Sequence, residues 1–380
     1  MSLQSKLPQA TTSIFAIMSK MAADHNAVNL SQGFPDFPVA PELITLVATA
    51  MKEGKNQYAP MPGLPILREN IAVKIEHLYG ATINPATEIT ITAGGTQALF
   101  AAITALVHEG DEVIMFDPAY DSYDPVIKLN KGIPVHLELK APFFGINWEE
   151  VEANISPKTK AIIINTPHNP TGAVLSNLDL HILEKLVAKY GLYVISDEVY
   201  EHIIFDGKTH ESILKYPAIY ANGIAIFSFG KTFHATGWKT GYMVAPTEIT
   251  KELRKMHQFN VFATNTPVQY GVAEYIKNEE NYLPLPAFYQ AKRDRFAELL
   301  SSSRFEALNC YGTYFQLFSY DKISDKPDTE MAEWMTKEHG IATIPASVFY
   351  ENGAHINYLR ICFAKSEETL QQAAEILCKI

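Results

Sequence analysis

The stretch Ile226-Phe227-Ser228-Phe229-Gly230-Lys231-Thr232 determines how the rest of the chain is interpreted. It opens within the apolar run of residues 223–227, which predicts a short buried strand behind a turn. The strand leads to a hydroxyl at Ser228, a lysine at Lys231 and a second lysine at Lys239. A single lysine at such a position usually extends its amine to solvent. A lysine held near other cations has a lowered pKa and can attack a carbonyl group, so other segments must decide between these interpretations.

Length and composition indicate a globular protein of two domains. The chain has 380 residues, which is more than one hydrophobic core usually holds. Hydrophobic residues make up 47% and charged residues 19%, as in ordinary globular enzymes. The formal net charge is −11, with acids and bases interspersed, which argues against nucleic acid or an anionic membrane as a partner.

Cysteine and histidine usage predicts a cytoplasmic protein without a metal site. The three cysteines, Cys310, Cys362 and Cys378, form no CxxC pair and imply no disulfide framework. The first eight residues contain no apolar core of signal-peptide length, and no apolar run approaches a membrane span. The twelve histidines show neither HExxH nor zinc-knuckle spacing.

The N-terminal quarter alternates predicted helices with irregular loops. Apolar spacing predicts helices over residues 12–23, 41–53 and 67–79. The loop of residues 29–38 contains Gly33, which allows the backbone to approach a ligand, although a plain connection explains the loop equally well. The loop of residues 56–65, with three prolines and a glycine, presents a phenol at Tyr58.

From residue 88 the pattern becomes strand, turn and helix. Residues 88–92 predict a strand, residues 93–97 a glycine turn, and residues 98–107 an apolar helix. Free N–H groups and the helix dipole make such a turn an anion site. A tight turn without a ligand explains Gly94-Gly95 equally well when the segment is taken alone.

Two further predicted strands end in segments that could face a ligand. The strand of residues 112–116 is followed by Tyr120, and the strand of residues 160–164 by a rigid loop that contains Asn169. In a doubly wound sheet, ligands bind at the carboxyl ends of the strands. Tyr120 could therefore stack on a flat cofactor, or it could be an ordinary core or surface tyrosine.

The strand of residues 192–196 leads directly into Asp197. Burying this carboxylate is costly unless it meets a cation, and a protonated pyridine nitrogen would be one. Pyridoxal phosphate (PLP) requires an acid at its ring nitrogen, a phosphate cup and a reactive lysine. The glycine turn, Asp197 and Lys231 together would satisfy these three requirements.

The C-terminal part predicts a second, α+β domain. A strand over residues 242–245 is expected beside the strand of residues 223–227, followed by helices over residues 250–258 and after Pro267. The pattern changes around Pro284 and Pro286, and the remainder predicts helices over residues 287–301 and 367–379 and strands over residues 313–318 and 358–363. Arg360 lies inside a hydrophobic strand. A buried arginine needs a carboxylate, which either a substrate or a structural ion pair would supply.

Taken in order, these features resemble the class I/II PLP-dependent aminotransferases of fold type I over nearly the whole chain. Within that family the chain is most similar to methionine aminotransferases related to kynurenine aminotransferase and glutamine transaminase K. The segments Gln32-Gly33-Phe34-Pro35-Asp36-Phe37 and Ser228-Phe229-Gly230-Lys231-Thr232 carry the narrower match. The resemblance implies an α/β fold with a large domain, whose mixed, mostly parallel sheet is flanked by helices, and a smaller α+β domain. The expected division is an N-terminal arm of residues 1–22, a large PLP-binding domain of residues 43–282, and a small domain of residues 23–42 and 283–380.

The resemblance also implies a role for each candidate site residue. Lys231 matches the Schiff-base lysine, and Asp197 matches the acid at the ring nitrogen. The other cofactor-binding positions are those of the stacking ring, of the groups at the phenolic oxygen and of the phosphate cup: Tyr120, Asn169, Tyr200, Gly95, Thr96, Gln97, Ser228 and Lys239. Arg360, Asn169 and the Gly33 backbone match the cradle of the substrate carboxylate.

Two further residues match positions that family members contribute to the neighbouring subunit. Tyr58 matches a tyrosine that reaches the phosphate of the other chain, and Phe262 is similar to an aromatic residue in its substrate pocket. The resemblance therefore implies a homodimer with shared active sites.

The chain departs from the family pattern at two positions that carry an arginine in many or some members. Many members have arginine where this chain has Lys239, and lysine lacks the planar fork, so we expect a less rigid grip on the phosphate. Members specific for dicarboxylates receive an arginine near the segment that is Phe259-Asn260-Val261-Phe262-Ala263 here. That segment has no cation, so aspartate and glutamate are not expected as the best donors.

The leading interpretation is an aminotransferase that passes the amino group of methionine, glutamine, or an aromatic or kynurenine-like amino acid to a 2-oxo acid by a ping-pong mechanism. The alternative on the same scaffold is a PLP-dependent carbon–sulfur β-lyase. A non-catalytic regulator is disfavoured by the intact Lys231 and Asp197. A dinucleotide binder is disfavoured because Gly94-Gly95 lacks GxGxxG spacing.

Overall fold

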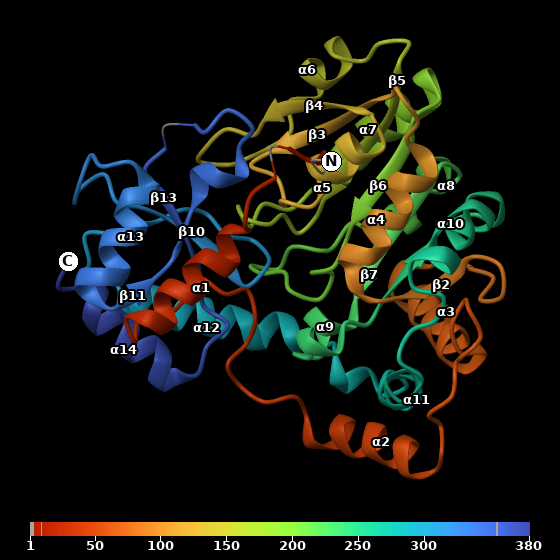
Figure 1. The fold of residues 1–380 in the computed structure, drawn as a ribbon, viewed down its shortest axis with the longest axis horizontal. Helices are drawn as coiled ribbons and strands as arrows, with labels where there is room; N and C mark the ends of the chain where they lie inside the picture. The colour runs from red at the N-terminus through yellow and green to blue at the C-terminus, as the bar shows by residue number, and fades with distance from the viewer. Residues whose placement is uncertain (1–3, 9, 355) are drawn as a thin grey trace.

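A seven-stranded sheet forms the centre of the protein, whose computed structural model describes residues 4–8, 10–354 and 356–380 (Figure 1). The strand order is β2-β8-β7-β6-β5-β3-β4. The strands are β2 (Ile89–Thr92), β3 (Glu112–Asp117), β4 (Ile133–Glu138), β5 (Thr159–Asn165), β6 (Tyr193–Asp197), β7 (Gly223–Ser228) and β8 (Gly241–Val244). Only β8 runs antiparallel to its neighbours in this sheet, which confirms the predicted mixed, mostly parallel sheet.

Alternate residues of the central strands enter two separate hydrophobic clusters. In β5, Ile162 and Ile164 join one cluster, whereas Ala161 and Ile163 join the other. Helices α4 (Gly94–Leu106), α5 (Tyr123–Leu129) and α10 (Thr247–Asn260) contribute to the second cluster, and α3 (Pro65–Tyr79) and α7 (Asn177–Tyr190) to the first. Helices thus cover both faces of the sheet, which explains why its central strands β5, β6 and β7 are largely apolar and buried.

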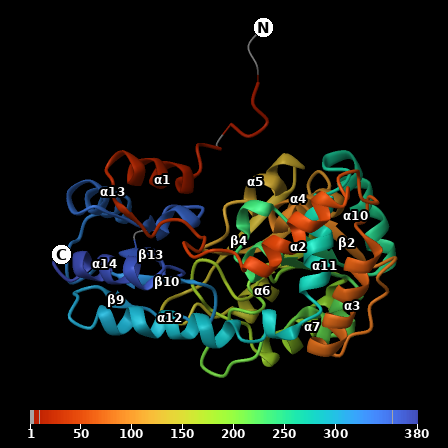
Figure 2. The same cartoon turned by 90° about the horizontal axis from the view of Figure 1, so that it is seen from below.

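The C-terminal elements form a second layered unit beside the sheet (Figures 1 and 2). An antiparallel sheet has the order β12-β13-β10-β9, with strands β9 (Glu306–Ala307), β10 (Phe315–Ser319), β12 (Ile344–Pro345) and β13 (Tyr358–Cys362). Its helices are α12 (Leu285–Leu299), α13 (Asp328–His339) and α14 (Glu367–Leu377). A mixed helix and strand unit was predicted for this part of the chain.

The N-terminal segment packs on this second unit rather than on the central sheet. Strand β1 (Val28–Asn29) pairs in parallel with β11 (Ile341–Ala342), and α1 (Ile14–Asp24) packs against β11 and α13. This pairing joins segments predicted to share the small domain, while the exact division stays a prediction. The predicted arm of residues 1–22 includes residues 1–3 and 9, which lie outside the described residues.

The remaining helices connect these layers. Helix α2 (Pro41–Lys52) packs against α11 (Thr266–Tyr275), at the lower edge of Figure 1. Short helices are α6 (Trp148–Ala153), α8 (Pro217–Tyr220) and α9 (Phe229–Thr232), and 3₁₀ turns occupy Ile213–Lys215, Thr236–Trp238, Glu279–Asn281 and Ala346–Phe349. Lys231 therefore lies on α9, directly after strand β7.

The predicted turn over residues 93–97 is wrong, because α4 already begins at Gly94. The two glycines form the first turn of the helix, where Gly94 has a φ of +79°. The sequence pattern did not indicate this helix start, because glycine has a low helix propensity and no apolar side chain to contribute to a helical period. No helix among the described residues is long and apolar enough to span a bilayer.

Candidate active site

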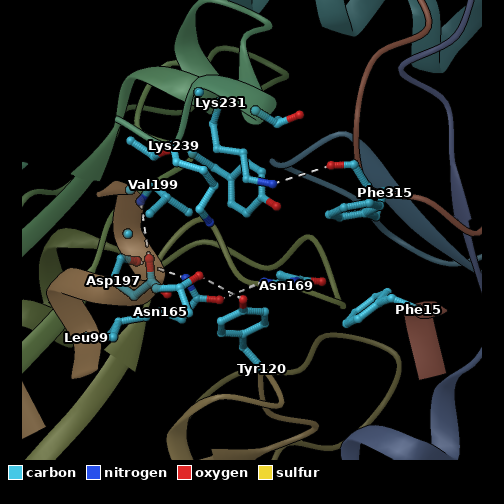
Figure 3. A pocket seen from close by; sticks show the side chains of 18 of the residues that line it. Phe15, Leu99, Tyr120, Asn165, Asn169, Asp197, Val199, Lys231, Lys239 and Phe315 are labelled. Carbon is cyan, nitrogen blue, oxygen red and sulfur yellow. Dashed lines mark hydrogen bonds between the residues drawn. The ribbon is translucent and has the colours of Figure 1, made fainter. Parts of the chain in front are cut away.

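A cavity of about 220 Å³ opens where the carboxyl ends of the central strands meet the C-terminal unit (Figure 3). Asn165 ends β5, Asp197 ends β6 and Ser228 ends β7, and all three line the cavity. Phe315 of β10 and Arg360 of β13 close it from the other side. The site therefore lies where ligands bind in open α/β sheets.

Lys231 points into this cavity from α9 (Figure 3). Its Nζ lies 3.0 Å from the Tyr314 hydroxyl and 3.4 Å from the Gly33 carbonyl oxygen. Burial lowers the pKa of Lys231 to about 8, and the Arg360 guanidinium adds to the effect. An appreciable fraction of the amine is then unprotonated near neutral pH, as a nucleophile or a general base requires.

Asp197 is the only acidic residue among the described residues that line the cavity. Its Oδ2 accepts a hydrogen bond of 2.6 Å from the Tyr123 hydroxyl. Burial raises the pKa of Asp197 to about 6, while the Tyr123 hydrogen bond opposes the rise. Among the described residues no cation lies within 4.0 Å of the carboxylate, so a positively charged ligand atom would compensate for its burial.

The start of α4 forms an anion cradle at one end of the cavity. Ala93, the N-cap residue of α4, makes no side-chain capping hydrogen bond, so the first backbone N–H groups of the helix remain available to a ligand. A Cβ on Gly94 would lie 3.6 Å from Lys239 Nζ, so this amine is close to the helix start. The hydroxyls of Thr96 and Ser228 also face the cavity. Helix N–H groups, two hydroxyls and an amine suit a phosphate.

Arg360 is fully buried in β13 and faces the same cavity. Its two terminal nitrogens donate hydrogen bonds to Asn169 Oδ1 at 2.9 Å and to the Ser31 carbonyl at 3.0 Å. The Phe315 ring lies 3.9 Å from the guanidinium carbon. Burial lowers the pKa of Arg360 to about 10, and its Nε has no hydrogen-bond partner among the described residues. A carboxylate entering the cavity would therefore meet an arginine without an acidic partner.

The cavity gathers eleven of the fourteen residues predicted for the site. These are Gly33, Gly95, Thr96, Tyr120, Asn169, Asp197, Tyr200, Ser228, Lys231, Lys239 and Arg360. Gln97 lies beside the cavity rather than in its lining, and its side-chain oxygen accepts a hydrogen bond from Ala93 N. Tyr58 and Phe262 lie outside it and contact each other, with ring centroids 5.3 Å apart.

Several lining or neighbouring residues were not predicted. Tyr123 contacts Asp197, Tyr314 contacts Lys231, and Phe15 of α1 lines the cavity. Tyr123 lies three residues after Tyr120, and this proximity to a strand end was a usable signal. Phe15 and Tyr314 gave no such signal, because only the packing of the two units brings them to the cavity.

The residues present fit pyridoxal phosphate. The anion cradle at α4 suits its phosphate, and the buried Asp197 suits its cationic ring nitrogen. Tyr120 also lines the cavity, with its hydroxyl 3.2 Å from the Thr96 hydroxyl of the cradle. The amine of Lys231 and the side chain of Asn169 face the same space.

Comparisons with known proteins agree with this chemistry. The family model "Aminotransferase class I and II" matches residues 25–377. The chain is 50% identical to a methionine aminotransferase of Escherichia coli, over 98% of this chain and 97% of that protein. It is 36% identical to human kynurenine–oxoglutarate transaminase 1, over 95% of this chain and 94% of that protein. A solved Escherichia coli structure with a reported methionine aminotransferase function superposes with a TM-score of 0.98, at 49% identity and full coverage of both chains.

Proposed function

The chain belongs to the class I and II aminotransferases, enzymes that depend on pyridoxal phosphate, and from this premise we propose its substrates. The amino donor is a neutral amino acid such as methionine, glutamine, or an aromatic or kynurenine-like amino acid. The acceptor is a 2-oxo acid, and the two substrates react in turn by a ping-pong mechanism. The main support is the 50% identity to a methionine aminotransferase over nearly the whole chain.

The charges of the cavity also support a neutral donor. The described lining contains three cationic side chains, Lys231, Lys239 and Arg360. Lys239 lies at the anion cradle and Lys231 is the reactive amine, so Arg360 remains for one carboxylate. A second carboxylate on the substrate would be buried without a partner, which costs binding free energy.

We assign the following roles to residues of the cavity. Pyridoxal phosphate, when bound, supplies an electron-withdrawing ring that makes the α-proton of the amino acid acidic. Asp197 binds the N–H of the ring nitrogen and keeps it protonated. Lys231 would act as the general base and acid, taking the proton from the α-carbon of the bound substrate at its Nζ and giving it up again. Arg360 pairs with the substrate α-carboxylate through its two-pronged fork.

The remaining predicted residues hold the cofactor. We place its phosphate at the cradle of Gly95, Thr96, Ser228 and Lys239, with Gln97 supporting the first turn of α4. Tyr120 would stack on the ring, and Asn169 and Tyr200 would hold its phenolic oxygen by hydrogen bonds. Asn169 already accepts a hydrogen bond from Arg360, so it links the cofactor to the carboxylate site.

We further propose a homodimer in which each subunit completes the other's site. The Tyr58 side chain is 83% exposed in the single chain, which is unusual for an aromatic residue packed against another ring. Phe262 is 46% exposed, and Phe259 beside it is 87% exposed. Exposed aromatic residues that gather from distant segments are typical of a protein interface. The three cysteines carry no disulfide, which supports a location in the reducing cytoplasm.

A panel of amino donors tests the proposed specificity. We expect methionine or another neutral donor to give a kcat/KM about a hundredfold or more above aspartate, since an unpaired buried carboxylate costs a few kcal/mol. The product 2-oxo acid is measured with one common acceptor. Equal or better turnover of aspartate would contradict the neutral-donor assignment.

The same panel addresses the lyase alternative, which no observation here favours. Incubation with cystathionine or a cysteine conjugate should release little pyruvate compared with the 2-oxo acid formed by transamination. Pyruvate as the dominant product would show that carbon–sulfur cleavage is the main reaction.

A further inference from the structure

Tyr314 makes the shortest hydrogen bond to the reactive lysine, yet none of the proposed roles includes it. Its side chain is fully buried, and its hydroxyl lies 3.0 Å from Lys231 Nζ. The same hydroxyl lies 2.7 Å from the Gly33 carbonyl oxygen, which is itself 3.4 Å from Lys231 Nζ. One amine, one hydroxyl and one carbonyl thus form a closed triangle at the edge of the cavity.

The direction of each hydrogen bond follows from what these groups can do. A carbonyl oxygen only accepts, so the single hydroxyl proton of Tyr314 is donated to Gly33. The lone pairs of the Tyr314 oxygen then face Lys231, whose ammonium donates to them. Burial raises the pKa of Tyr314 well above its ordinary value, so the phenol stays neutral. The triangle therefore presents two acceptor oxygens to the protonated lysine.

The two acceptors are held rigidly in place. The Tyr314 ring packs edge-on against Tyr200, with centroids 5.2 Å apart, and lies 5.7 Å from the ring of Tyr289. A Cβ on Gly33 would lie 2.5 Å from the Phe315 ring, so only glycine allows this backbone to come so close. The neighbouring Ser31 carbonyl is bound by Arg360. The backbone of residues 31–33 therefore connects the Gly33 carbonyl to Arg360, the residue to which we assign the substrate carboxylate (the carboxylate site).

We propose that Tyr314 is a positioning residue whose hydroxyl, with the Gly33 carbonyl, forms a dock for the free amine of Lys231. The proposal rests on the role assigned to Lys231 above. The dock holds the amine beside the carboxylate site, within reach of the substrate α-carbon, whenever the amine is not covalently engaged. It also stabilises the protonated form of the lysine, because only an ammonium donates hydrogen bonds to both oxygens well.

The hydroxyl of Tyr314, rather than its aromatic ring, stabilises the protonated form of Lys231. Lys231 Nζ lies 5.4 Å from the ring centroids of both Tyr200 and Tyr314, and phenylalanine would preserve the ring contact. The other charged or titratable groups that face Lys231 are Arg360 and Lys239, which lower its pKa, and Cys362 and Asp197, which raise it. A change confined to the Tyr314 hydroxyl leaves all of these in place.

The test is the variant Tyr314→Phe, with Tyr289→Phe as its matched control. Tyr289 is equally buried in the same aromatic cluster, and its hydroxyl has no hydrogen-bond partner among the described residues. The pKa of Lys231 is measured by NMR in lysine-labelled, cofactor-free protein, with the resonance assigned by its loss in Lys231→Arg. We expect about 8 in the parent and in Tyr289→Phe. In Tyr314→Phe we expect it to fall by about one pH unit, since one hydrogen bond to the charged form is lost.

Kinetics of the holoenzyme give a second readout. In Tyr314→Phe we expect kcat to fall about tenfold with little change in KM, because the free amine loses its fixed position. The acid limb of the pH profile of kcat should move to lower pH, in the same direction as the pKa. Circular dichroism and thermal unfolding check that the fold is retained, as the preserved ring packing leads us to expect.

The outcomes separate this inference from the proposed function. An unchanged Lys231 pKa and an unchanged kcat in folded Tyr314→Phe would overturn the dock. Equal effects in Tyr289→Phe would also overturn it, because the cause would then be general repacking. Near-normal turnover in Lys231→Ala would instead refute the role assigned to Lys231, whatever the NMR measurement shows.

Discussion

At the scale of single residues, the candidate active site is distinguished by three ionisable side chains that are buried or half-buried. Asp197 and Arg360 are buried and Lys231 is half-buried, and burial favours the neutral form of each. It raises the pKa of Asp197 and lowers the pKa values of Lys231 and Arg360. The acid and the two cations do not pair with one another; each instead faces the cavity. Such unpaired buried charges cost stability, and a charged ligand would offset that cost.

Asp197→Asn tests the role of the acid. Asparagine keeps the shape but cannot stabilise a protonated ring nitrogen, so we expect the rate of amino transfer from methionine to fall about hundredfold or more. Single-turnover measurements with methionine record this rate. The control is Asp206→Asn, because Asp206 pairs with Arg293 away from the cavity. Parent-like activity of Asp197→Asn would show that Asp197 is structural.

At the scale of elements, the segment of residues 31–33 matters as much as any helix. It connects Arg360, through the Ser31 carbonyl, to Lys231 and Tyr314, through the Gly33 carbonyl. The close approach of this backbone to Phe315 makes these contacts possible. Any side chain at residue 33 must therefore push the segment away from both partners.

Gly33→Ala should weaken substrate binding without unfolding the protein. Overpacking by one methyl group costs about 1–3 kcal/mol, which corresponds to a rise in KM for the amino acid of about fivefold to a hundredfold. Steady-state kinetics with methionine measure the change. Gly145→Ala is the control, since no described atom lies within 4 Å of the added Cβ. A parent-like KM in Gly33→Ala would contradict the role assigned to the segment of residues 31–33.

At the scale of the whole molecule, an ionic cluster joins the edge of the central sheet to the C-terminal unit. His136 of β4 hydrogen-bonds Asp117 at 2.9 Å and Asp124 at 3.2 Å, and lies 3.6 Å from Glu351. The backbone N–H of Glu351 also donates to Asp117 at 2.9 Å. Burial alone would lower the pKa of His136, but hydrogen bonds to Asp117 and Asp124 raise it to about 9.

This cluster predicts a pH-dependent contribution to stability. The folded pKa lies above the ordinary value of 6.5, so the contribution is complete below pH 6.5 and is lost as the pH rises through about 9. We expect His136→Gln to lower the free energy of unfolding by about 1–2 kcal/mol at pH 6, after allowance for solvent screening. The difference from the parent should shrink by pH 10.

Denaturant unfolding at several pH values measures that difference. His181→Gln is the matched control, because the pair of His181 with Glu184 is exposed on α7. A difference between the parent and His136→Gln that does not change with pH would exclude protonated His136 as the source of the stabilisation.

Subunit mixing tests the shared active site, which is also a property of the whole molecule. One variant carries Tyr58→Ala and Phe262→Ala, and the other carries Lys231→Ala. Random exchange gives about half heterodimers, and one of their two sites is then intact at all three positions. We expect recovery to about a quarter of the parent activity, measured after exchange is verified by tag pull-down. Activity no higher than that of the separate variants would mean that Tyr58 and Phe262 serve their own chain.

Much of the fold and of the site follows from the sequence alone. Apolar periods located the strands that end at Asn165, Asp197 and Ser228, because each strand is a short buried run. The edge strand β4 and helix α13 were not predicted. The first is interrupted by Pro134 and polar residues, and the second is rich in charges, so neither shows a clean apolar period. Resemblance to a family, rather than periodicity, supplied the roles of Tyr58 and Phe262, and it favoured a substrate over a structural ion pair as the partner of Arg360.

The tertiary structure decided what lies close in space but far apart in the chain. Lys231, Tyr314 and Gly33 meet because the C-terminal unit closes over the ends of the central strands. The same packing buries Arg360 against Phe315 and sets the pKa of Lys231. A local pattern reports which residues share a face of one element. Distances between elements depend on how whole layers pack. The pKa of a buried group depends on every charged and polar group around it.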